Sequence, residues 1–147
     1  MKITDAFIAE HAVIYAQLDY LEHAIPAARS LGEVKVMAGL LEAALKPHAE
    51  AEDELLFNGL EPGLDQMGKL EKVQHEHDAI CKGLAQVQAA KAKKEAQRRL
   101  LNVVHLTQKE FDLEDRILFR LAEELLREDT LVKLGKSWAR KRVVPAR

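Results

Sequence analysis

Apolar residues recur every three or four positions along most of the chain, and this spacing places them on one face of an α-helix. The first two periodic stretches end at breaks that contain glycine, SLG at 30–32 and NGLEPG at 58–63. Gly32 is expected to end the first helix. The four long stretches, and a shorter and weaker one after them, lie at about 4–29, 33–58, from 64 or 65 onward, 95–127 and 130–139.

The chain has no run of alternating, β-branched residues that would predict a strand. Its dominant residue types (alanine, leucine, glutamate, lysine, glutamine and arginine) are strong helix formers. Long helices joined by short turns pack antiparallel, so we predict an all-α protein built as an up-down-up-down antiparallel four-helix bundle. The bundle is expected to cover residues 1–128, and a short helix with a basic tail is expected to cover 129–147.

Composition narrows the class of protein without identifying its chemistry. The 147 residues include 31% charged ones and carry a formal net charge of −2, which argues against a dedicated nucleic-acid-binding protein. Cys81 is the single cysteine, so an internal disulfide is excluded and a reducing, cytoplasmic location is expected. No apolar stretch has the length of a signal peptide or a membrane span. The basic end at 138–147 is expected to be a solvated tail, and it is a candidate for binding a protein partner.

Three histidines, His11, His48 and His77, each occupy a position on the apolar stripe of a different helix, where leucine is usual. A single histidine on such a face is most often a core residue with an ordinary hydrogen-bond partner. Three of them, buried without partners, would together cost on the order of several kcal/mol. A shared metal ion removes this cost, since neutral imidazole is a preferred ligand for iron, copper and zinc. Cys81, one turn after His77, is expected to be a small buried residue.

Glutamates lie on the same faces as these histidines. Glu52 follows His48 by four residues, so both side chains project from one helix face about one turn apart. In the fourth helix Glu110 and Glu114 lie near the centre of the apolar stripe, whereas His105 lies about 140° from Glu110. Glutamates on a buried stripe are rare unless they are paired or bind metal, and the alternative is a salt-bridged surface pair. The predicted stripe consists of Val103, Leu106, Leu113, Ile117 and Leu121.

Taken in order, these residues resemble the hemerythrin-like family, also called the HHE cation-binding domain, over nearly the whole chain. The family has a histidine on the first helix, His-x-x-x-Glu on the second, one or two histidines on the third and His-x-x-x-Glu on the fourth. The matching segments are EHAVI with His11, LKPHAEAEDELLF with His48 and Glu52, and HEHDAI with His77. The resemblance implies two non-haem iron ions, bridged by an oxo or hydroxo group. Zinc or another divalent metal is the alternative cofactor.

The fourth helix departs from the family pattern. Aligning EDRILF (114–119) with EDELLF (52–57) sets Glu114 opposite Glu52 and places Glu110 where the family has a histidine. A second alignment resembles the oxygen-carrying hemerythrins, with His105 followed five residues later by Glu110. We favour Glu110 and Glu114 as ligands, with His105 as the alternative. By this resemblance the three histidines on the other helices are terminal ligands, Glu52 and Glu114 bridge the metals, and Glu110 is terminal.

The resemblance implies a protein that binds or senses oxygen, nitric oxide or peroxide, or that handles iron. A glutamate in place of the fourth-helix histidine makes the site richer in carboxylates. By analogy with ferritin-like proteins, such a site favours ferric iron and oxidation chemistry over reversible oxygen carriage. Peroxide- or oxygen-dependent oxidation is an enzymatic alternative, although no proton donor or substrate pocket can be identified in the sequence. Two further alternatives are a regulatory or interaction protein with a structural zinc, and a degenerate bundle without metal.

Overall fold

The structure, a computed structural model, describes residues 1–58 and 69–143 of the chain. Every element in these two ranges is helical, and they contain no strand. The all-α class predicted from the sequence is therefore confirmed for the described residues. The elements are α1 (Ile3–Ala24), α2 (Leu31–Glu52), η1 (Asp53–Phe57), α4 (Lys69–Ala89), α5 (Lys93–Leu113), η2 (Glu114–Leu118), α6 (Phe119–Leu125) and α7 (Glu128–Arg142).

The boundary between α1 and α2 differs from the prediction. Helix α1 ends at Ala24, two residues before Pro26, which has no amide hydrogen with which to continue a helix. The next helix begins after Ser30, whose side chain accepts a hydrogen bond from the backbone amide of Glu33 at 3.1 Å. Such a cap satisfies one of the free amides at a helix start. Gly32 therefore lies in the first turn of α2, and its predicted role at the end of the first helix is wrong.

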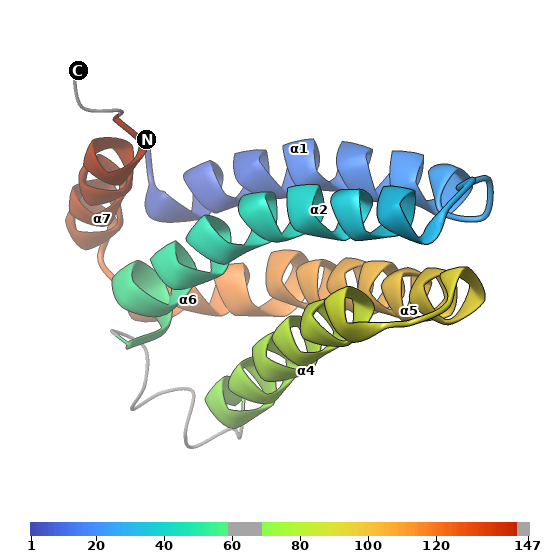
Figure 1. Cartoon of the computed structure of the whole chain (residues 1–147). Coiled ribbons are helices and arrows are strands. Elements are labelled where there is room, and N and C mark those ends of the chain that lie inside the picture. Colours follow the sequence, from blue (N-terminus) through green and yellow to red (C-terminus); the bar gives the residue numbers. More distant parts are fainter. Residues whose placement is uncertain (59–68, 144–147) are drawn as a thin grey trace.

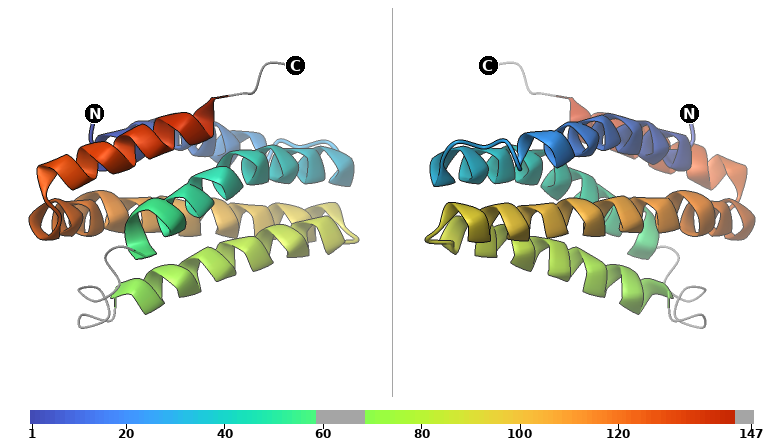
Figure 2. Two further views of the ribbon diagram at one scale, coloured as in Figure 1. Left: turned by 90° about the vertical axis from the view of Figure 1, so that its left-hand side faces the viewer. Right: turned by 90° about the vertical axis from the view of Figure 1, so that its right-hand side faces the viewer.

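The long helices form two hairpins that lie against each other (Figure 1 and Figure 2). Helices α1 and α2 make one hairpin, and α4 and α5, joined through residues 90–92, make the other. Helix α1 contacts α5, and α2 contacts both α4 and α5. Both figures show that α4 diverges from α5 toward its own N-terminal end.

Two short π-helical segments continue α2 and α5 at equivalent places. In η1 the amide of Asn58 bonds to the carbonyl of Asp53, and in η2 the amide of Phe119 bonds to that of Glu114. Each such bond spans five residues instead of four, so the residues that follow it are shifted by one position around the helix. Phe119 is consequently buried, whereas Ile117 is 40% exposed. The predicted stripe of the fourth helix is therefore wrong at Ile117, because an ideal helix was assumed to continue past Glu114.

Two apolar clusters fill the interior, one toward the α1–α2 and α4–α5 connections and one toward the chain's first residues. The larger cluster is built from the main stripes of all four long helices, and its largest fully buried members are Leu18, Ile25, Leu41 and Leu100. The smaller cluster includes three phenylalanines that are at most 2% exposed, namely Phe7, Phe57 and Phe119. Burial of one such side chain contributes about 1.5–3 kcal/mol. The helix segments between the two clusters carry the polar residues of interest.

The C-terminal helix predicted at 130–139 is longer than expected and is α7 (Glu128–Arg142). It contacts α1 and η1, and in Figure 1 it lies at the end of the bundle where the chain begins. Three predicted features lie outside the described residues: the NGLEPG turn after Asn58, the start of the third helix at 64 or 65, and the last four residues of the basic tail. Among the described helices, none is both long and apolar enough to cross a membrane.

Candidate metal centre

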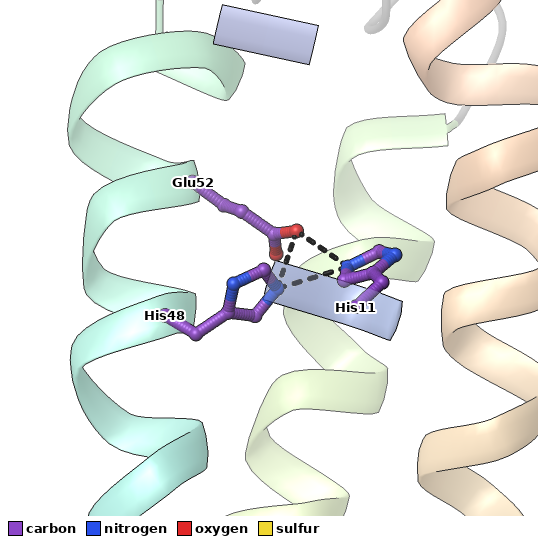
Figure 3. A group of neighbouring side chains, drawn as sticks. All are labelled: His11, His48 and Glu52. Atoms are coloured by element: carbon purple, nitrogen blue, oxygen red, sulfur yellow. Dashed lines mark hydrogen bonds and ion pairs between the residues drawn. The ribbon is translucent and has the colours of Figure 1, made fainter. Parts of the chain in front are cut away.

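His11, His48 and Glu52 meet in the interior between the two apolar clusters (Figure 3). The His11 and His48 rings direct their Nε2 atoms toward each other at 2.9 Å. The Oε1 atom of Glu52 lies 2.8 Å from His48 Nε2 and 3.2 Å from His11 Nε2. Donor atoms bound to a single metal ion at about 2.1 Å are separated by about 3 Å. These three atoms therefore have the spacing of ligands around one ion.

A second group shares Glu52 with the first. Atoms of Glu52, His77 and Glu114 lie within 4.8 Å of one another, and the second oxygen of Glu52 is 3.7 Å from His77 Nε2. Glu110 joins them on the other side, with its Oε1 atom 2.5 Å from His77 Nε2. Glu114 also approaches the first group, at 3.9 Å from His11 Nε2. The two carboxylates in the middle, Glu52 and Glu114, thus face both groups.

Burial and hydrogen bonding show whether these residues fit a metal. Glu52, Glu110 and Glu114 are at most 1% exposed. Both oxygens of Glu114 and the second oxygen of Glu52 have no hydrogen-bond partner among the described residues. Leaving buried carboxylate oxygens unpaired is costly, whereas a cation bound between them satisfies several at once. The residues present therefore fit a bound cation, with imidazole nitrogens and carboxylate oxygens as its donors.

Each histidine of the cluster presents its other ring nitrogen to a carboxylate outside the centre. His11 Nδ1 lies 2.7 Å from Asp115, while His48 Nδ1 and His77 Nδ1 lie 3.6 Å from Glu10 and Asp53 respectively. The last two distances are those of an ion pair rather than of a short hydrogen bond. Metal-binding histidines commonly have such a partner, which fixes the ring orientation and leaves Nε2 free for the metal.

The sequence offered a partial signal for these outer carboxylates. Asp53 and Asp115 each follow a glutamate of the centre directly, in the repeated pair ED at 52–53 and 114–115. Glu10 directly precedes His11 but faces His48 on the neighbouring helix. The repeated pair identifies the first two, while the contact of Glu10 depends on how α1 and α2 pack.

Electrostatics within the centre raise the proton affinity of the histidines. Burial lowers the pKa of His48, but Glu52 and Glu10 outweigh burial and raise it to about 9. Burial likewise lowers the pKa of His77, and contacts with Asp53 and Glu110 raise it to about 10. In the absence of a cation, protons on these rings balance part of the buried negative charge.

The pKa values of the three buried glutamates are shifted in opposite directions. Burial raises the pKa of Glu52, but the neighbouring His48 and His11 hold it well below its usual range. The pKa of Glu114 is raised well above its usual value, first by burial and then by the charge of Glu52. Burial also raises the pKa of Glu110, although its contact with His77 acts against this. A centre with more carboxylates than it can ionise without a cation is typical of a metal site.

Aromatic rings hold the first group in place. Phe111 stacks on His11 with ring centroids 3.8 Å apart and planes 8° from parallel. Phe7 contacts the His48 ring edge-on at 5.7 Å. These apolar rings restrict the rotation of both imidazoles and exclude water from one side of the centre. The centre is therefore held by packing as well as by hydrogen bonds.

A cavity of about 360 Å³ reaches the centre from between α2, α4 and α5. At its inner end it is lined by residues of the polar cluster, including His48, Glu52, His77 and Glu110. Elsewhere its wall is largely apolar, with Leu45, Ala49, Ile80, Leu84 and Phe111. Its lining residues come from α2, η1, α4 and α5, so the opening forms where these elements pack against one another.

Six of the seven predicted metal ligands come together here, and His105 does not. The side chain of His105 is 63% exposed, and its nearest acidic partner is Glu22 on α1 at 3.7 Å. Helix α5 continues regularly past His105, so no local irregularity turns this residue inward. The structure therefore groups His105 with Glu22 on the surface rather than with the other six residues, and its role as an alternative ligand stays a prediction. Cys81 is exposed and lines the cavity, so its expected burial is also wrong.

Fold and centre together define a cation-binding helical bundle, with three histidines and three glutamates directed into one interior. The family described as the hemerythrin HHE cation binding domain matches residues 2–122, and the chain belongs to this family. The resemblance expected from the motifs is therefore confirmed. No curated protein and no solved structure was found to match the chain.

Proposed function

We propose that the four long helices form the up-down-up-down bundle of this family and hold two non-haem iron ions. The first ion is bound by His11, His48 and Glu52, and the second by His77, Glu110 and the two central glutamates. Glu52 and Glu114 bridge the ions. The protein uses this centre to bind or sense oxygen, nitric oxide or peroxide.

One observation carries this proposal: a single buried carboxylate, that of Glu52, faces both groups of ligands. Its Oε1 atom contacts His11 and His48, and its Oε2 atom is directed to the His77 side. A carboxylate that binds a single ion directs its bound oxygens to one set of donors, whereas the two oxygens of Glu52 face two different sets. This arrangement supports two ions held about one carboxylate apart.

The donor set favours iron over zinc. Structural zinc sites in proteins are closed and four-coordinate, and they commonly use thiolates. Here the described cluster has three imidazoles and three carboxylates, and a cavity reaches it. Ferritin-like di-iron proteins use four glutamates and two histidines, so this centre has one more nitrogen donor and one fewer carboxylate. When bound, iron would supply redox chemistry with a small oxygen- or nitrogen-containing ligand.

The protein itself would limit which ligands reach the iron. The cavity wall is mainly apolar, while its outer part includes the acidic residues Glu42, Glu50, Asp53 and Asp78 and one lysine, Lys46. An acidic rim disfavours the entry of anions, and an apolar wall suits small neutral molecules. Oxygen, nitric oxide and hydrogen peroxide are all small and uncharged.

Metal analysis after anaerobic loading with ferrous iron tests the proposal directly. We expect two irons per chain, and visible absorption bands that change when oxygen, nitric oxide or peroxide is added. In a control loaded with zinc instead of iron, the protein should bind the metal but show no such absorption bands. One tightly bound zinc per chain that iron does not displace, or no bound metal and an unchanged melting temperature, would contradict the proposal.

A pair of variants on the fourth helix distinguishes its ligands. Glu114→Ala is expected to lose at least one iron per chain, because it removes a buried carboxylate that faces both groups. His105→Ala is expected to retain two irons, since its side chain lies on the surface. Iron content after dialysis is the measurement. Loss of iron in the His105 variant alone would show that the other register of the fourth helix is the correct one.

Binding of a protein partner by the basic C-terminal end stays a prediction. Two of its cations, Lys141 and Arg142, contact Glu54 and Glu10 within the chain.

A further inference from the structure

Helix α7 begins at Glu128, beyond the family match at 2–122, yet its last turn reaches the vicinity of the metal centre. Arg142 donates hydrogen bonds from Nη2 to both carboxylate oxygens of Glu10, at 2.7 and 2.9 Å, and from Nε at 3.3 Å. The indole nitrogen of Trp138 donates to Glu10 Oε1 at 2.8 Å. Two side chains one turn apart on α7 thus bind the same carboxylate.

The carboxylate that they bind is the outer partner of His48. Glu10 Oε1, the oxygen that accepts from Trp138, lies 3.6 Å from His48 Nδ1. His48 Nδ1 is buried and has no hydrogen-bond partner among the described residues. Arg142 also donates to the backbone carbonyl of Pro47 at 3.3 Å, immediately before His48 in the chain. Both the ring and the backbone at His48 are therefore in contact with groups that α7 holds.

These contacts differ from an ordinary surface ion pair. The side chain of Glu10 is 18% exposed and that of Arg142 is 29% exposed. An arginine that donates to both oxygens of a carboxylate has a defined geometry, and partial burial protects the pair from screening by salt. The Arg142 guanidinium also lies 5.9 Å from the centre of the Trp138 ring, which restricts both side chains.

Packing elsewhere on α7 fixes the position from which these side chains reach Glu10. Leu131 is 2% exposed and belongs to the smaller apolar cluster. Gly135 lies so close to the chain's start that a Cβ atom there would overlap the carbonyl oxygen of Met1. Lys141 contacts Glu54 in η1. These contacts hold α7 against η1 and the chain's first residues, and from there Trp138 and Arg142 reach Glu10.

We propose that α7 is a positioning element of the metal centre, in which Trp138 and Arg142 hold the Glu10 carboxylate in place beside His48. The proposal rests on the metal-binding function proposed above, but it assigns a role to a segment outside the family match. Outer carboxylates orient metal-binding histidines, and their loss typically weakens metal binding about 10–100-fold. A substitution in α7 would thus alter the affinity for the metal at His48 although no metal-binding residue is replaced.

The test uses the full chain with three substitutions, Glu10→Gln, Trp138→Phe and Arg142→Gln, and with Co²⁺ as a visible probe. Glu10→Gln is expected to weaken one of the two Co²⁺ ions about 10–100-fold and to leave the other unchanged. The Trp138 and Arg142 variants should weaken the same ion by about 10-fold or less. Lys141→Gln is the matched control, since it removes a neighbouring cation of α7 that contacts Glu54 and not Glu10.

A double variant shows whether Arg142 acts through Glu10. If it does, Glu10→Gln combined with Arg142→Gln should bind Co²⁺ no more weakly than Glu10→Gln alone, because residues that share one contact are not additive. Multiplied effects in the double variant, or unchanged Co²⁺ affinities in both α7 variants, would overturn the proposal. Melting temperatures measured in parallel identify any variant that fails to fold. If Arg142→Gln does not fold, Trp138→Phe still tests the proposal, because it removes the indole donor and keeps an aromatic ring in the same place.

A measurement without metal separates this proposal from the proposed function. In the metal-free protein, the ring resonances of His48 in a ¹H–¹⁵N spectrum should shift in Arg142→Gln and Trp138→Phe, while those of His77 should not. If the unsubstituted protein binds no Co²⁺, the metal-binding function fails, and this shift still decides whether α7 orients His48. Unchanged His48 resonances would overturn the role of α7 even in a protein that binds two ions.

Discussion

Replacing Glu52 with glutamine is expected to remove both metal ions from the protein. The loss of affinity for each ion should exceed about 100-fold, the upper end of what is typical when a residue that only orients a metal ligand is replaced. Glu52 is the one residue shared by the two groups of metal-binding side chains found in the described part of the chain. Glutamine has nearly the same size but no charge, and one of its two donor atoms becomes an amide nitrogen that cannot bind a cation. One ion therefore loses its donor, and the other keeps a neutral amide oxygen in place of a charged carboxylate oxygen.

Glu110→Gln is the matched control for this prediction. Glu110 is as buried as Glu52, but within the cluster its oxygen contacts only His77, at 2.5 Å. We expect this variant to lose the ion on the His77 side and to keep the other. Metal content after dialysis and a Co²⁺ titration distinguish two ions, one ion and none. A Glu52 variant that holds two ions with unchanged affinity would refute a bridging role.

The metal-free protein is expected to lose stability as the pH rises from about 6.5 to about 10. The folded state holds the pKa of His48 at about 9 and that of His77 at about 10, both above the value of about 6.5 for an unfolded chain. The stability gained from these protons is fully present below pH 6.5 and is lost as the pH passes through the folded-state values. The free energy of unfolding should fall by about 1.4 kcal/mol per pH unit for each proton that only the folded state retains.

The buried glutamates do not reverse this trend. The raised pKa values of Glu110 and Glu114 also make the folded state lose stability as the pH rises above the usual range of a carboxyl group. The depressed pKa of Glu52 acts in the opposite sense, but its contribution is complete before pH 6.5. Urea unfolding at pH 7, 8 and 9 measures the slope. His77→Gln should make it shallower by about one proton, whereas His105→Gln on the exposed face should not change it.

Bound metal should reverse the dependence on pH. A cation takes the place of the protons on His48 and His77, so metal binding releases protons and tightens as the pH rises. The stability added by metal, measured as the difference between loaded and metal-free protein, is therefore expected to be larger at pH 8 than at pH 6.5. A metal-free protein whose stability is constant or rises between pH 7 and pH 9 would contradict the raised pKa values.

The periodic pattern of apolar residues by itself determined the helical class, the approximate extent of the long helices and the inward faces of the first three. This signal is local, because residues three and four apart share a helix face whatever surrounds them. The same local geometry predicted that His48 and Glu52 project together and that Glu110 and Glu114, rather than His105, point inward. In the structure these residues do meet, with His11 and His77 from two other helices.

Tertiary structure alone decided the features that depend on distant parts of the chain. The extra residue in the π-helical turn of η2 moved Phe119 inward and Ile117 outward. The apolar period of the helix does not predict such a turn, because it depends on how the helix packs against its neighbours. Cys81 is exposed and lines the cavity between the helices, although its position one turn after His77 predicted burial. Contacts between Glu10, His48 and Arg142 join residues up to 132 positions apart. No local pattern encodes such contacts, because they arise only when separately formed helices pack and bring their side chains within reach of one another.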